Sequence, residues 1–81
     1  MISRFERGAL RDLSRLAESD AKTIVDAIGA FAETGVGDVK KLRAQDPPAW
    51  RLRVGRFRVL YRREGATLIV VAVKDRRDAY R

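Results

Sequence analysis

The segment Trp50–Tyr61, WRLRVGRFRVLY, constrains the fold more than any other part of the chain. Apolar residues alternate with arginine on both sides of Gly55, and a period of two is typical of strands with one buried face. We therefore expect two short strands joined at Gly55. Arg51 and Arg53 point from the same face of the first strand, and Arg58 alternates with apolar neighbours on the second. Because guanidinium groups carry fixed charge and a fork of donors, such a face suits a polyanion rich in phosphate.

Two amphipathic helices are predicted before these strands. Leucines at positions 10, 13 and 16 indicate a first helix over about Glu6–Ala17. Ser19 is the expected N-cap of a second helix, which has a 3.6-residue apolar pattern and ends at Gly35. Gly29 interrupts that helix at a cost of about 1 kcal/mol, which suggests a close contact there with a neighbouring element. Both helices are short and closely joined, as in an antiparallel hairpin.

The remaining strands complete the predicted fold. We expect a connection over Gly35–Pro48, a strand over Phe57–Arg63, a turn at Glu64-Gly65 and a central strand over Thr67–Val73, which is apolar on both faces. Phe57 and Tyr61 are expected in the core. The predicted class is α+β, with a two-helix hairpin on one face of a small, mainly antiparallel sheet, in a single domain spanning 1–81.

Composition excludes several kinds of chemistry. The 81 residues include neither cysteine nor histidine, so disulfides, thiol catalysis and the commonest metal ligand are ruled out. The net charge of +7 is uneven: residues 1–39 hold five basic and seven acidic side chains, whereas residues 40–81 hold thirteen basic and four acidic ones. The second half is therefore the one expected to face a polyanion. No secretory signal or membrane-spanning segment is visible, and a cytoplasmic protein is expected.

Four segments together resemble one family of proteins. RGALRDLSRL (Arg7–Leu16), KKLR (Lys40–Arg43), WRLRVGRFRVLY and RRDAYR (Arg76–Arg81) resemble the RelE/ParE superfamily of bacterial toxins, and the RelE branch most of all. The resemblance implies a type II toxin that is neutralised by a cognate antitoxin, with operator DNA bound only through that antitoxin. The family usually opens with a strand. Only Met1–Phe5 precede the first helix here, so that strand is expected to be short or missing.

The resemblance also implies roles for individual residues. RelE-like members cut messenger RNA in the ribosomal A site, and cleavage by the 2′-hydroxyl needs a base, cations around the phosphate and an acid, but in principle no metal or cofactor. The resemblance gives functional roles to five positions: Arg51, Arg53, Arg58, a basic residue near Arg76 or Arg77, and Tyr80. The three strand arginines would bind phosphate and stabilise the charge of the transition state, and Tyr80 would stack on a base or donate a hydrogen bond to a phosphate.

The sequence departs from this family pattern at the catalytic base. Arginines stand at positions 51 and 53 where the prototype has lysines, and Asp75 stands where many relatives have histidine. Arginine does not lose its proton in proteins. The base is therefore Asp75, Glu64, an ionised Tyr80 or water, and Asp75 is the best placed by sequence. Asp75 and Asp78 alone are too few to predict a metal site.

Three functions remain open at this point. The first is a ribosome-dependent messenger RNA endonuclease. The second is a ParE-like inhibitor of DNA gyrase, which needs no catalytic base. The third is a catalytically impaired toxin homologue that only binds its antitoxin. Trp50 is expected to pack in or beside the core rather than to stack on a base.

Overall fold

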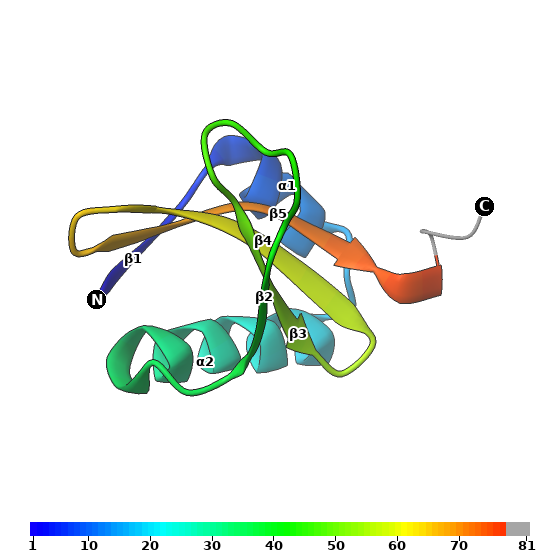
Figure 1. Cartoon of the computed structure of the whole chain (residues 1–81). Coiled ribbons are helices and arrows are strands. Elements are labelled where there is room, and N and C mark those ends of the chain that lie inside the picture. The colour runs from blue at the N-terminus through cyan, green and yellow to red at the C-terminus, as the bar shows by residue number, and fades with distance from the viewer. Residues whose placement is uncertain (78–81) are drawn as a thin grey trace.

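The computed structural model describes residues 1–77. Along the chain its elements are β1 (Ile2–Phe5), α1 (Arg7–Ser14), α2 (Glu18–Thr34), β2 (Asp38–Lys41), β3 (Trp50–Val54), β4 (Phe57–Glu64) and β5 (Thr67–Asp75). The strands form one twisted sheet in the order β1-β5-β4-β3-β2 (Figure 1). Only the β1–β5 pair among these neighbours is parallel. The predicted α+β class with a mainly antiparallel sheet is confirmed.

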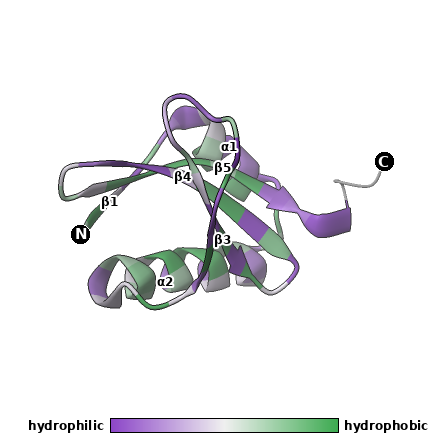
Figure 2. Ribbon diagram, viewed as in Figure 1, coloured by the Kyte–Doolittle hydropathy of each residue, from purple (hydrophilic) through white to green (hydrophobic). Residues whose placement is uncertain are grey.

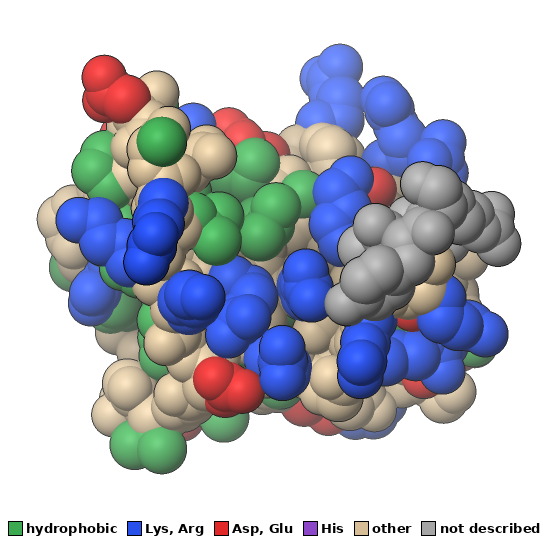
Figure 3. Space-filling view, turned by 45° about the vertical axis from the view of Figure 1, so that its right-hand side comes forward, with side chains coloured by type: hydrophobic (Ala, Val, Ile, Leu, Met, Phe, Trp, Pro, Cys, Tyr) green, Lys and Arg blue, Asp and Glu red, His purple; other side chains and the backbone are tan. Residues whose placement is uncertain are grey.

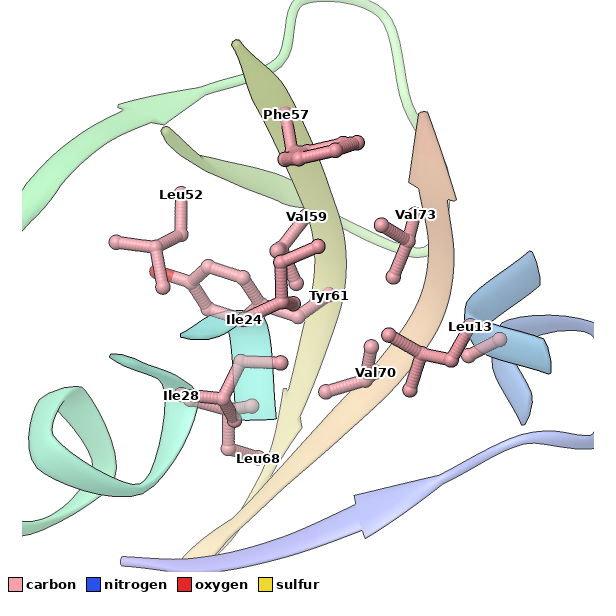
Figure 4. Close-up of a cluster of buried hydrophobic side chains, with 11 residues drawn as sticks. Leu13, Ile24, Ile28, Leu52, Phe57, Val59, Tyr61, Leu68, Val70 and Val73 are labelled. Atoms are coloured by element: carbon pink, nitrogen blue, oxygen red, sulfur yellow. The ribbon is translucent and has the colours of Figure 1, made fainter. Parts of the chain in front are cut away.

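The core lies on one face of this sheet. Phe57, Val59 and Tyr61 alternate along β4 and are buried, and β5 adds further apolar side chains. Both helices bury residues in the same cluster, among them Leu13 of α1 and Ile24 of α2 (Figure 4). The opposite face of β4 is left to the residues between, which include arginines. Figure 2 shows that β5 is apolar along most of its length and becomes hydrophilic at its end.

Aromatic packing agrees with the sequence. Trp50 lies directly opposite Tyr61, and the two rings stack with centroids 6.0 Å apart and planes 17° apart. Phe31 of α2 meets Tyr61 at 5.6 Å in a tilted arrangement. The predictions that Trp50 packs at the core and that Phe57 and Tyr61 lie inside it are confirmed.

The helix boundaries differ from the predicted ones. Helix α1 ends at Ser14, because the backbone N–H of Arg15 already bonds to the carbonyl of Asp12 and that of Leu16 to the carbonyl of Leu13 in tighter turns. The prediction of Ser19 as N-cap was wrong: α2 begins at Glu18, after an extended Ala17. Glu18 and Asp20 in the first turn complement the helix dipole. Gly35 is the C-cap as predicted, with φ 72°.

The expected close contact between Gly29 and a neighbouring element is not present. A Cβ built there would meet no atom within 4 Å, so the glycine is not required by packing. Gly37 is the glycine at which neighbouring side chains leave no room for a Cβ, since a Cβ there would lie 2.8 Å from Leu52 Cδ1 and 3.0 Å from Phe31 Cδ1. The close approach therefore occurs in the segment after α2 rather than inside it.

Two strands and one turn refine the predicted sheet. β2 lies inside the segment that was predicted to be a connection, and all four of its residues are exposed. β1 is present but only four residues long, in agreement with the expected short first strand. The β4–β5 turn lies at Gly65-Ala66, one residue later than predicted. Over residues 1–77, neither helix has both the length and the apolar character that crossing a membrane requires.

Candidate nucleic-acid interface

Three cations stand side by side on three neighbouring strands. Arg53 of β3 lies directly opposite Arg58 of β4, and Arg58 lies directly opposite Lys74 of β5. Residues paired in this way point to the same face of a sheet. Because strands are about 4.8 Å apart, the three Cα atoms span only about 10 Å. We call this set the cationic row: Arg53, Arg58 and Lys74.

A second row of the same face lies two residues along the strands. Arg51 is directly opposite Lys40 of β2 on one side and Leu60 of β4 on the other. The Arg51 side chain is only 16% exposed, and its terminal nitrogen lies 3.7 Å from Asp38 Oδ1. Its Nε is buried and finds no hydrogen-bond partner in residues 1–77. Arg62 lies further along β4, paired with Ile69.

These side chains define one surface, which we call the basic face: Lys40, Arg51, Arg53, Arg58, Arg62 and Lys74. By strand alternation it lies opposite to Phe57, Val59 and Tyr61, and therefore opposite to the core. Figure 3 shows Lys and Arg side chains gathered across one side of the molecule, with few acidic groups among them. Arg51, Arg53 and Arg58, which the sequence singled out, are thus brought together.

Asp75 is not brought to the basic face. It lies opposite the buried Phe57, so it points to the other side of β5. Its carboxylate accepts bonds from Arg56 Nε at 3.2 Å and from the Arg77 backbone N–H at 3.0 Å. These hydrogen bonds, first of all the one from the Arg77 backbone, hold the pKa of Asp75 below its ordinary value. Asp75 is a well-bonded structural carboxylate rather than an accessible proton acceptor.

The other sequence-predicted residues lie outside the cationic row. Arg76 and Arg77 follow β5 and are exposed, and an Arg77 terminal nitrogen lies 3.2 Å from Asp75. Glu64 ends β4, six residues from Arg58, which is about 20 Å at 3.3 Å per residue. Tyr80 lies outside the described residues.

Three residues of this face were not predicted from the sequence. Lys74 and Lys40 add positive charge, and Asp38 adds a carboxylate directly opposite Arg53. Asp38 is 61% exposed at its side chain, unlike Asp75 at 10%. The face therefore holds fixed cations beside a carboxylate and an ammonium that can exchange protons. Such a set can bind a phosphodiester and move a proton to or from it.

A family comparison matches nearly the whole chain. The model described as the ParE toxin of the type II toxin–antitoxin system parDE matches residues 4–80. No curated protein sequence gives a significant match.

Solved structures match over a similar extent. The RelBE2 toxin–antitoxin complex from Mycobacterium tuberculosis is 30% identical, with a TM-score of 0.75, covering 93% of this chain and 96% of that one. The RelB–RelE complex from Methanococcus jannaschii is 24% identical, with a TM-score of 0.74 and coverages of 94% and 93%. The isolated RelE toxin from E. coli is 16% identical, with a TM-score of 0.71 and coverages of 91% and 82%. The last two likenesses concern the fold alone.

Proposed function

Since the chain belongs to the ParE toxin family of type II toxin–antitoxin systems, we propose that it is a toxin that cleaves messenger RNA on the ribosome. The basic face is the surface that holds the RNA in this proposal. An RNA target is what the resemblance of the sequence to the RelE branch implies, and one of the solved relatives is a RelBE2 toxin–antitoxin complex.

One observation carries the proposal. Arg53, Arg58 and Lys74 lie directly opposite one another on the side of the sheet away from the core. Within residues 1–77 no carboxylate lies in ion-pair distance of any of the three. Uncompensated cations held this close repel one another, and a phosphate relieves that repulsion.

In this proposal each step of transesterification is assigned to a residue of the basic face. The Asp38 carboxylate takes the proton of the 2′-hydroxyl, and the 2′-oxygen then forms a bond to the adjacent phosphorus. Arg53 and Arg58 stabilise the extra negative charge on the phosphate oxygens. The bond from phosphorus to the 5′-oxygen breaks, and the Lys74 ammonium donates a proton to that oxygen. The products are a 2′,3′-cyclic phosphate and a free 5′-hydroxyl. In this scheme Asp38 replaces Asp75 as the base.

We also propose a cognate antitoxin as the physiological partner. Several solved relatives are complexes with RelB antitoxins. An acidic antitoxin segment over the basic face would exclude RNA from it, and any contact with operator DNA would be made by the antitoxin.

Induction in a bacterial host tests the proposal. Wild-type protein should arrest growth and produce new messenger RNA ends in phase with codons, whereas Arg58→Ala should reduce both. Arg11→Ala is the matched control, because Arg11 is an exposed arginine on α1 and not on the basic face. Growth arrest without new codon-phased ends would refute cleavage.

Inhibition of DNA gyrase is the second candidate. It is favoured by the description of the matching family model, a ParE toxin, and by the absence of histidine. Induction would then produce DNA damage and trapped gyrase–DNA complexes while messages stay intact. The same cultures, probed for both outcomes, separate the two functions.

A further inference from the structure

Two apolar side chains lie in the middle of the basic face. Leu60 of β4 is directly opposite Arg51 on one side and directly opposite Ala72 of β5 on the other. Both are partly exposed, and neither belongs to the buried core cluster. Ile69, opposite Arg62 on the same face, is 2% exposed and also lies outside that cluster. Because Ile69 is buried and not available to a ligand, we call only Leu60 and Ala72 the apolar floor.

Basic residues are neighbours of this floor both along its strands and across the β3–β4 pairing. Arg58 and Arg62 stand two residues before and after Leu60, each about 6.6 Å away along the strand. Arg51 borders Leu60 across the β3–β4 pairing, and Lys74 follows Ala72 by two residues on β5. A small apolar area inside a ring of four long basic side chains is therefore built into the sheet.

This arrangement has no evident role in folding. The core is on the other face, so Leu60 and Ala72 do not contribute to it. Long basic side chains tend to lay their aliphatic stems along apolar surface. The charged ends of Arg51 and Arg62 lie within ion-pair distance of Asp38 and Glu6, whereas Arg58 and Lys74 have no such carboxylate in residues 1–77. The result is a small apolar patch bordered by basic residues, which we call the seat.

We propose that the apolar floor seats one nucleobase of the bound RNA, while the bordering basic residues hold the phosphates on either side of it. The inference rests on the proposed function and adds to it, because it assigns a base-binding place next to the phosphate row. A nucleobase has a flat apolar surface and is flanked in its strand by anionic phosphates, which is the complement of this seat. Ala72 keeps the seat open, since a larger side chain there would fill it.

Binding to two matched oligonucleotides tests the seat. One is a single-stranded RNA with 2′-O-methyl groups, which cannot be cleaved; the other has the same length and phosphates but abasic sugars. Wild-type protein should bind the first about fivefold more tightly, near the lower end of what stacking one base contributes. Leu60→Thr, which keeps strand propensity, should abolish that difference and leave binding to the abasic strand unchanged. Ala72→Leu should do the same by filling the seat.

Val39→Thr is the matched control. Val39 is an exposed apolar strand residue opposite Leu52, and so on the other face of the sheet, and its replacement should change neither affinity. If Leu60→Thr keeps the wild-type preference for base-bearing RNA, the inference is overturned. Equal weakening on both strands would overturn it as well. Arg58→Ala tests the phosphate site separately from the base seat, because it should weaken binding to both oligonucleotides. If it changes binding to neither, the proposed function is overturned together with this inference.

Discussion

The charge of the basic face sets how its RNA affinity should depend on salt. Four of its cations have no carboxylate within ion-pair distance in residues 1–77: Lys40, Arg53, Arg58 and Lys74. Arg51 and Arg62 lie 3.7 Å and 3.3 Å from Asp38 and Glu6. For single strands each neutralised phosphate adds about −0.7 to the slope of log affinity against log salt, so four contacts predict about −2.8. Raising salt from about 50 to about 200 mM should then weaken binding about 50-fold.

Arg58→Ala removes one of these contacts and should reduce the slope to about −2.1, so the same rise in salt weakens binding only about 18-fold. Fluorescence anisotropy of a labelled single-stranded RNA at several salt concentrations measures both slopes. Arg11→Ala lowers the net charge by the same amount but removes an α1 residue, and its slope should equal that of the wild type. Equal slopes for wild type and Arg58→Ala, or equal reductions in both variants, would refute a localised phosphate site.

Three further predictions concern folding. The pKa of Asp75 is lowered in the folded state. Its carboxylate should therefore stabilise the fold above pH 3.8, and this stabilisation should be lost as the pH falls through the folded-state pKa. In urea unfolding, Asp75→Asn should be less stable than wild type at pH 7, and the difference in stability should disappear in acid. Ile28 is 0% exposed, and Ile28→Ala should cost about 2–5 kcal/mol in urea unfolding, whereas a loss under about 0.5 kcal/mol, typical of a surface change, would contradict the core assignment. Gly29→Ala should gain about 0.5–1 kcal/mol, because the space around Gly29 is open; a lower melting temperature would contradict this.

Much of the fold follows from local pattern. The alternation across Gly55 predicts both strands of the β3–β4 hairpin, and with them the pairing of Arg53 and Arg58. The sequence pattern did not predict β2, because its four residues are all exposed and show no alternation of apolar and polar side chains. It is an edge strand whose place is set by pairing with β3 rather than by burying a face. The pairing of β1 with β5 joins residues more than sixty positions apart, and no local signal reports it.

The site depends on one irregularity that the sequence does not reveal. The register of β4 with β5 pairs Tyr61 with Val70 and Leu60 with Ala72, so Val71 is an extra residue, a β-bulge. In a regular ladder Lys74 would lie opposite Phe57 on the core side, and Asp75 would point to the basic face. The bulge shifts the register of β5 by one residue, so Lys74 points to the basic face and Asp75 points to the core side. Because residues 67–73 are apolar on both faces, alternation could not reveal the shift. The carboxylate chosen from the sequence was therefore on the wrong side of the strand, and the lysine beside it joined the cationic row.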